Sequence, residues 1–417
     1  MNNMLGKYSF GVGDRFNCQA EAQLKAIIEA KNKFGCDITP VWNKSYREHT
    51  TIGSKPMDTR IAVDKAVNKL GWSYSYFVDA DHVNAKIIDQ FIGSCDFFTI
   101  DVADYIGAPI EDAELQSFLE FNSKYIGNLV IPGIKEVYNI TEEMLCNIAK
   151  KYLTAVIHAS KLYKIIKENK KDDSYVIEVS MDETEESQTP IEMFFILSGL
   201  SMEGVPVNTI APKFNGRFNK GVNYVGDLNK FEKEFDEDIL VLKYAIAEFG
   251  FPDGLKLSVH SGSDKFDIYP IMNKLIKKHD IGLHVKTAGT TWLEEVIGLS
   301  QQGGDGLKFA QEVYSSARER FFELTSPYST VIDIDETKLP TVSEVNLWTS
   351  EKFSKTLEHN LGCEDYNVHF RQLIHVAYKI AAENGSDYID LLLKYKKEVG
   401  SNVAYNILER HIKPIFI

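Results

Sequence analysis

Residues 255–286, LKLSVHSGSDKFDIYPIMNKLIKKHDIGLHVK, contain a strand, a helix and a second strand in direct succession. The two ends, Leu255–His260 and Ile281–Lys286, are short β-rich runs of the length expected for buried strands. Between them, Asp267–His279 places apolar residues at three- and four-residue steps, which is typical of a helix packed against a sheet. A strand that leads through a helix into another strand is the unit of parallel α/β folds.

The same unit recurs throughout residues 1–304, and Gln19–Lys33 and Lys230–Phe249 show the same helical spacing. Eight strand–helix pairs in a row predict an α/β fold of the (β/α)8 TIM-like barrel type. An open, doubly wound sheet would give a similar alternation, so the count alone leaves that alternative open. The eight expected strands are Tyr8–Val12, Asp37–Trp42, Ser75–Asp79, Phe97–Asp101, Tyr175–Val179, Pro206–Ala211, Leu255–His260 and Ile281–Lys286.

Two regions depart from this regular alternation. A long insertion after the fourth strand, at about residues 106–171, is expected to hold two helices with a turn at Pro132-Gly133 between them. Residues 305–417 show helical patterns and no further strand–helix pair. We therefore expect a barrel domain at 1–304, which includes the insertion, and a helical C-terminal extension at 305–417 packed on the barrel.

The composition excludes several classes of protein. Of the 417 residues, 44% are hydrophobic and 25% are charged, which is the usual mixture of a globular protein. A formal net charge of -14 argues against nucleic acid or an anionic membrane as the main partner. The five cysteines are dispersed and form no CxxC pair, as in proteins of a reducing compartment. With no stretch of about 18 apolar residues, we expect a cytoplasmic protein.

Three strands carry charged or imidazole side chains inside otherwise apolar runs, namely Glu178, His260 and His284. The active site of a (β/α)8 barrel forms at the C-terminal ends of its strands, where these residues are expected to lie. Carboxylate and imidazole are the usual ligands of divalent ions, so the three together indicate a metal site, with zinc or manganese the expected ion. A single strand histidine can also be a structural residue, and no short ligand spacing connects these three.

Acid–base candidates follow the third and fifth strands. Asp81 is a candidate acid/base group or ligand, and His82 a candidate ligand or substrate contact. Because neighbouring residues on a strand point to opposite faces, only one of them is expected in the site unless the strand has ended. Asp182, or Glu183 beside it, is a candidate for the second acid/base group; a solvated loop or a helix N-cap would also account for both.

Lysines near the strand ends, Lys44, Lys213, Lys265 and Lys286, are candidates for binding an anionic substrate, together with Asp264 and Thr287. For Lys44 an ordinary surface position is the alternative. A Schiff-base role is a further alternative for Lys286. The C-terminal histidines His359, His369 and His375 lie in helical context and are expected to be core or surface residues.

Four segments resemble the tagaturonate epimerase family: FVDADHV (77–83), EVSMDETE (178–185), SVHSGSDKFDIYPI (258–271) and HVKTAGTTWLEE (284–295). The resemblance implies a metal-dependent (β/α)8 enzyme that interconverts D-tagaturonate and D-fructuronate in hexuronate catabolism. Related enzymes act on neutral ketohexoses as tagatose 4-epimerases. By resemblance the ligands are His82, Glu178, His260 and His284, with Asp81 and Asp182 near the reacting carbon, and Arg15 or a strand-end lysine on the substrate carboxylate.

The implied reaction inverts a carbon that is one bond beyond the position next to the ketone, so one α-proton abstraction cannot reach it. Retro-aldol cleavage and re-addition, or stepwise migration of an enediol, would each achieve the inversion. A metal-dependent sugar aldolase, an aldose–ketose isomerase and a non-catalytic sugar-binding protein are the alternatives, because barrels support many functions. Assembly into a homo-oligomer is compatible with the sequence.

Overall fold

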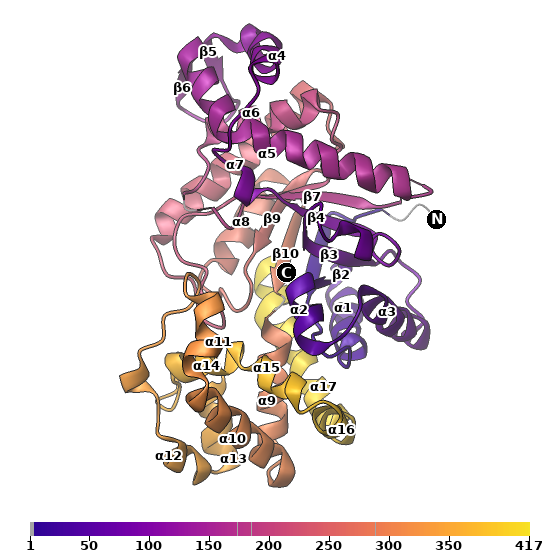
Figure 1. The fold of residues 1–417 in the computed structure, drawn as a ribbon, viewed down its shortest axis with the longest axis vertical. Helices are drawn as coiled ribbons and strands as arrows, with labels where there is room; N and C mark the ends of the chain where they lie inside the picture. Colours follow the sequence, from indigo (N-terminus) through magenta and orange to yellow (C-terminus); the bar gives the residue numbers. More distant parts are fainter. Residues whose placement is uncertain (1–3, 173, 185, 288) are drawn as a thin grey trace.

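Eight parallel strands close into a barrel in the computed structural model, which describes residues 4–172, 174–184, 186–287 and 289–417 (Figure 1). Each expected strand overlaps one barrel strand in chain order, and β1 pairs with β10 to close the ring. The (β/α)8 prediction is confirmed and the open sheet is excluded. The strands are β1 (Tyr8–Val12), β2 (Ile38–Ser45), β3 (Phe77–Val83), β4 (Phe97–Asp101), β7 (Val176–Ser180), β8 (Thr209–Ala211), β9 (Lys256–His260) and β10 (Leu283–Thr287).

Helices surround the barrel because alternate strand residues are apolar and buried against them. On β9, Leu257 and Val259 belong to the main hydrophobic core, whereas Lys256, Ser258 and His260 occupy the alternate positions. The helices around the barrel are α1 (Ala20–Phe34), α2 (Tyr46–Ile52), α3 (Pro56–Leu70), α5 (Glu142–Asn169), α6 (Pro190–Met202), α7 (Leu228–Phe249), α8 (Tyr269–His279) and α9 (Thr290–Gln301).

A separate small cluster of apolar side chains lies near the N-terminal ends of the barrel strands. Val41, Phe77, Phe97 and Val176 form this cluster, with Leu5 packed against it, apart from the main core. Further along the same strands the buried residues become polar, as at Asp79, Thr99 and Glu178 in the register of β3, β4 and β7. One end of the barrel is therefore filled by hydrophobic side chains, and the C-terminal end is lined by charged ones.

The insertion after β4 contains the two expected helices, α4 (Asp112–Asn122) and α5, and also a β-hairpin that the sequence analysis missed. Strands β5 (Gly127–Val130) and β6 (Val137–Ile140) pair antiparallel, and Pro132-Gly133 lies in the connection between them. Gly133 has a φ of 95°, which other residues rarely adopt. Two strands of four residues are too short to give a clear alternation, which explains the omission. The hairpin lies at the upper end of the molecule in Figure 1.

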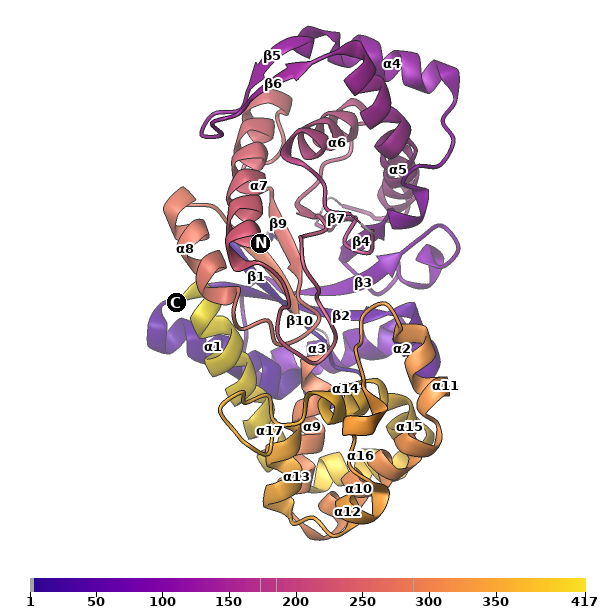
Figure 2. The same ribbon diagram turned by 90° about the vertical axis from the view of Figure 1, so that its left-hand side faces the viewer.

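The described part of the C-terminal region consists of helices and connecting loops without a strand, and it forms a second lobe below the barrel in Figures 1 and 2. Two helices expected to be long, 307–324 and 366–383, each divide into two. At the end of the chain, α17 packs on α1 and α9, and α18 packs on α8, so the chain returns to the barrel. The helices are α10 (Gly304–Glu319), α11 (Phe321–Thr325), α12 (Val342–Asn346), α13 (Ser350–Leu357), α14 (Val368–Val376), α15 (Tyr378–Glu383), α16 (Ser386–Lys394), α17 (Lys396–Tyr405), the π-helix η6 (Asn406–Ile412) and α18 (Lys413–Phe416), with short 3-10 turns such as η4 (Ser326–Tyr328).

Within the described ranges, none of the helices has the length and apolar character that crossing a membrane requires. The five cysteines are all free.

Candidate active site

Two histidines and one aspartate meet at the C-terminal ends of β3, β7 and β9. The Asp182 carboxylate lies 3.4 Å from His82 Nε2 through Oδ1 and 3.1 Å from His260 Nδ1 through Oδ2. The atoms of these three residues that could bind a metal all lie within 4.8 Å of one another. We call His82, Asp182 and His260 the mouth triad.

His82 reaches the triad through an unusual backbone conformation. Its φ is 54°, in the left-handed region that non-glycine residues seldom occupy, and the pairing of β3 with β4 shifts between Ala80 and Val83. The irregularity explains why Asp81 and His82 can both border the same site, although neighbours on a regular strand would point apart. Backbone strain of this kind concentrates at functional sites.

Each histidine of the triad is held from behind by a second carboxylate. His260 Nε2 lies 2.8 Å from Glu178 Oε1, and His82 Nδ1 lies 3.0 Å from Asp81 Oδ1. The other nitrogen of each ring faces the Asp182 carboxylate, at 3.4 Å for His82 Nε2 and 3.1 Å for His260 Nδ1. A histidine oriented by a carboxylate on one nitrogen, with its other nitrogen turned toward further candidate ligand atoms, is the usual arrangement of a metal ligand.

The pKa values of the two triad histidines indicate how a metal cation would bind there. Burial alone would lower the pKa of His260, but Asp182 and Glu178 outweigh burial and raise it to about 9. The His82 pKa is raised in the same way by Asp81 and Asp182 against the effect of burial. Protons on the imidazoles thus balance the carboxylates, and a divalent ion would replace those protons. The donor set of two imidazoles and one carboxylate fits zinc or manganese.

Lys286 lies beneath the triad, surrounded by carboxylates. Its Nζ is 2.8 Å from Asp79 Oδ2, 2.9 Å from Glu178 Oε1 and 3.0 Å from Asp81 Oδ1, and it also donates to Thr99 Oγ1. Burial would lower the Lys286 pKa, but the three carboxylates raise it well above its ordinary value. The amine is therefore an ammonium group that orders the carboxylates, and it is a poor nucleophile, which argues against the Schiff-base alternative.

A cavity of about 330 Å³ opens above Asp81 and His82, between the barrel and the C-terminal lobe. Its volume is at the lower end of the range for small-molecule sites. Several of its lining residues could not be predicted from the sequence, because they come from α2, from a loop and from the distant extension. His375 is buried as expected, yet it also lines the cavity. The lining includes Arg15, Arg47, Glu48, Glu183, Lys220, Tyr328, His375 and Tyr378.

The structure does not bring His284 into the mouth triad. Its Nδ1 lies 2.9 Å from Ser9 Oγ, its ring packs 5.2 Å from Phe97, and the whole side chain is buried. Burial is the main reason that its pKa falls to about 3, so the imidazole is neutral. On β10, His284 precedes Lys286 by two residues and therefore lies one layer deeper in the barrel. Asp182 takes the place among the candidate ligands that His284 was expected to fill.

Three expected substrate contacts have protein partners instead, and a fourth, Lys213, lies in a loop outside the cavity lining. Lys44 Nζ donates to the Arg15 backbone oxygen at 2.6 Å, and Thr287 Oγ1 donates to the Gly11 oxygen at 3.1 Å. Lys265 Nζ donates to the backbone oxygens of residues 219 and 222, at 2.9 and 2.8 Å. Lys213 is half-buried in the loop after β8, where its backbone N–H donates to a glutamine side chain. These four side chains are absent from the lining of the cavity.

Asp264, another expected substrate contact, is buried between the barrel and the extension. It accepts from Arg371 Nη2 at 2.7 Å and lies 3.0 Å from His359 Nδ1 and 3.2 Å from His411 Nε2. Arg15, by contrast, lines the cavity as expected: its Nε donates to Glu48 Oε1 at 2.8 Å, and its buried Nη1 has no partner among the described residues.

Comparisons with known proteins place this geometry in context. A family model described as UxaE, tagaturonate epimerase, matches residues 2–414. A tagaturonate/fructuronate epimerase of Thermotoga maritima is 30% identical over 421 residues, which cover 97% of this chain and 79% of that protein. A crystal structure of fructuronate-tagaturonate epimerase UxaE from Cohnella laeviribosi with one glycerol has a TM-score of 0.79 at 22% identity, covering 98% of this chain and 81% of the other. The structural match shows a shared fold.

Proposed function

This chain belongs to the tagaturonate epimerase family, and we propose that it interconverts D-tagaturonate and D-fructuronate in hexuronate catabolism. Membership makes it a carbohydrate epimerase, an isomerase. The observation that carries the proposed substrate is the pairing of the mouth triad with a small cavity whose lining includes three cationic side chains, Arg15, Arg47 and Lys220. A keto sugar acid whose carboxylate lies at the far end of the chain from the ketone needs both features: polar groups at the reacting carbons and cations at its carboxylate.

The mouth triad is proposed to hold a divalent ion, zinc or manganese. Support comes from the spacing of the donor atoms, the histidine nitrogens that face Asp182, and the carboxylates on the opposite side of both rings. Glu178 then orients His260 and is not itself a ligand. When bound, such an ion supplies a positive charge that stabilises the oxyanion developing at the substrate ketone.

Asp81 is proposed to move the proton. It borders the cavity, and Lys286 and His82 hold its carboxylate in place, each at 3.0 Å. In a retro-aldol route, Asp81 accepts the proton of the hydroxyl on the carbon to be inverted. The neighbouring C–C bond breaks, its electron pair passes to the carbon beside the ketone, and an aldehyde and an enediolate result. The aldehyde turns its other face, the bond re-forms, and Asp81 returns the proton.

Stepwise migration of an enediol is the alternative route, and deuterium distinguishes the two. In deuterium oxide the retro-aldol route keeps hydrogen on every carbon of the product, because only a hydroxyl proton is transferred. The enediol route removes carbon-bound hydrogen and introduces deuterium. We expect NMR of the product to show no carbon-bound deuterium.

The proposed function is tested by offering D-tagaturonate and D-tagatose side by side to enzyme supplied with Mn²⁺ or Zn²⁺. We expect D-tagaturonate to be converted to D-fructuronate and D-tagatose to react slowly. Faster conversion of D-tagatose to D-fructose would instead identify a neutral-sugar 4-epimerase, and lasting cleavage products would identify an aldolase. If neither sugar changes, the proposed function is wrong.

The proposed setting is the cytoplasm, since all five cysteines are free thiols. The net charge of -14 supports a small-molecule substrate and disfavours nucleic acid as a partner.

A further inference from the structure

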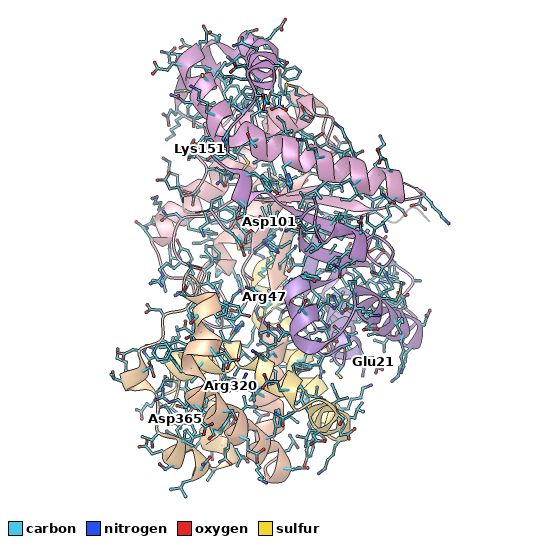
Figure 3. The ribbon with its side chains drawn as sticks, viewed as in Figure 1. Glu21, Arg47, Asp101, Lys151, Arg320 and Asp365 are labelled. Atoms are coloured by element: carbon cyan, nitrogen blue, oxygen red, sulfur yellow. The ribbon has the colours of Figure 1, made fainter. Side chains whose placement is uncertain are left out.

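Three cations from different parts of the barrel line the mouth cavity: Arg15 after β1, Arg47 on α2 and Lys220 after β8. We call them the cationic wall. Two tyrosines of the C-terminal lobe support it: Arg15 stacks 4.3 Å from the Tyr378 ring, and Arg47 lies 4.9 Å from the Tyr328 ring. Cation–π contacts of this kind hold a cation in place without neutralising its charge. Figure 3 shows Arg47 where the barrel faces the lobe.

The local sequence sets the position of Arg47. Ser45 ends β2 and caps α2, and Glu48 completes the capping box by accepting from the Ser45 backbone N–H at 3.1 Å. The other Glu48 oxygen accepts from Arg15 Nε, so both of its oxygens are engaged. Helix α2 therefore starts at the end of the strand, with Arg47 in its first turn at the rim of the barrel.

Two of the three wall cations have no ion-pair partner among the described side chains, although Glu183 lines the same cavity and acts on Lys220 through its charge. In the part of the chain that the structure describes, Glu48 pairs with Arg15, and Arg47 and Lys220 have no salt bridge at all. Arg15 Nη1 is buried and has no hydrogen-bond partner there. Burial lowers the pKa of Lys220, and the charges of Arg47 and Arg15 lower it further. Like charges gathered around one cavity repel one another unless an anion binds between them.

From this geometry we infer that the cationic wall binds the carboxylate of the sugar-acid substrate and makes the enzyme prefer a uronate to a neutral ketose. The inference rests on the proposed function. The wall borders the same cavity as Asp81 and His82, so one hexuronate can span both. Arginine suits the role because its planar donors match the two oxygens of a carboxylate.

Specificity would then depend on the C-terminal lobe as well as on the barrel. The rings of Tyr328 and Tyr378 contact the two arginines of the wall, and their hydroxyl groups lie 3.2 Å apart. On the barrel side, Lys265 stabilises the loop that carries Lys220, because Lys265 Nζ donates to the backbone oxygens of Asn219 and Val222. Lys265, expected from the sequence to contact substrate, would thus act as a positioning residue for Lys220.

The test measures kcat/KM for D-tagaturonate and for D-tagatose in Arg47→Met and Lys220→Met. Loss of a charge-assisted hydrogen bond should lower kcat/KM for the uronate by about 10- to 100-fold and change that for the neutral sugar by less than about threefold. Lys308→Met is the matched control, because Lys308 is an exposed cation on α10 outside the cavity lining, and both sugars should react as in the wild type.

Two results would overturn the inference while leaving the proposed function intact: an equal loss for both sugars, or no loss for the uronate in either variant. If the wild type converts neither sugar, the proposed function fails, and calorimetric titration with D-tagaturonate then decides about the wall. Binding by wild type and Lys308→Met that weakens about tenfold or more in both wall variants supports the inference. Equal binding, or none, in all four proteins contradicts it.

Discussion

Two clusters of histidine, carboxylate and cation include residues only four positions apart, His260 at the end of β9 and Asp264 in the loop after it. The surroundings of the two clusters are opposite. His260 joins the mouth triad, with Glu178 and Lys286 beneath it. Asp264 joins what we call the joint cluster, which links the barrel to the C-terminal lobe through His359, Arg371 and His411. In residue type the two are nearly the same.

Access distinguishes the two clusters. In the joint cluster the side chains of Asp264, Arg371 and His411 are at most 1% exposed, whereas in the mouth triad those of His82 and Asp182 are 23% and 24% exposed. The mouth therefore faces a cavity that a substrate can enter, and the joint is sealed within protein. Residue chemistry alone does not separate a catalytic cluster from a structural one; the surroundings do.

Removal of His260 is expected to have the largest effect on activity. His260→Ala deletes one imidazole of the triad and leaves Asp182 with a single histidine, so the epimerase rate should fall at least about 1000-fold, equivalent to about 4 kcal/mol. The urea midpoint of unfolding should change little, because the site is not part of the hydrophobic core. A rate within tenfold of wild type would mean that the chemistry occurs elsewhere.

Asp264→Asn should have the opposite effect to His260→Ala: it should lower stability and leave activity nearly unchanged. It leaves Arg371 buried without its charge partner, and we expect the free energy of unfolding to fall by about 3 kcal/mol. At a temperature where the variant is folded, its kcat should stay close to that of wild type. The matched control is Asp305→Asn, at an exposed pair with Lys394, where the loss should be below about 1 kcal/mol. If Asp264→Asn kept full stability but lost activity, the joint cluster would have to be reinterpreted as part of the site.

Glu178→Gln tests whether the carboxylate that contacts His260 Nε2 is needed for metal binding and catalysis. The substitution keeps the shape but removes the charge that holds His260 and balances Lys286, so Mn²⁺ affinity or kcat should fall by about 10- to 100-fold. Titration calorimetry and initial rates measure the two quantities. Thr209→Ser, which keeps the hydroxyl bonded to Glu178 Oε2, should leave both unchanged.

The pH dependence of stability should reflect a buried carboxyl group where α9 contacts α16 of the C-terminal lobe. Burial raises the pKa of Glu295 on α9 to about 8, and the carboxyl accepts from the Tyr388 hydroxyl of α16. Because the folded state keeps this proton to a higher pH than the unfolded state, stability is greatest below the ordinary carboxyl pKa and declines as pH rises toward 8.

Urea unfolding at pH 5.5, 7 and 8.5 measures this decline, which we expect to be on the order of 3 kcal/mol. Glu295→Gln cannot ionise and should show a flatter profile. An equally steep profile in the variant would show that another group is responsible.

The eight strands could be predicted because each is a local pattern in the sequence, and the fold followed from their number and order. The residue types of the mouth were also predictable, since Glu178 and His260 are unusual inside apolar strands. Asp264 was misplaced because its pairing with Arg371 spans 107 residues, and no local pattern records such a contact. Arg47 and Lys220 were missed for the same reason: their role depends on a cavity completed by the distant lobe.

The most direct test of the account is to titrate Mn²⁺ into chelator-treated enzyme while following conversion of D-tagaturonate to D-fructuronate. We predict no activity without the ion, a rise in proportion to the ion added, and a plateau at about one equivalent per chain, with no rise in His260→Ala. Full activity of the metal-free enzyme, or recovery in His260→Ala equal to that of wild type, would contradict the assignment of the mouth triad.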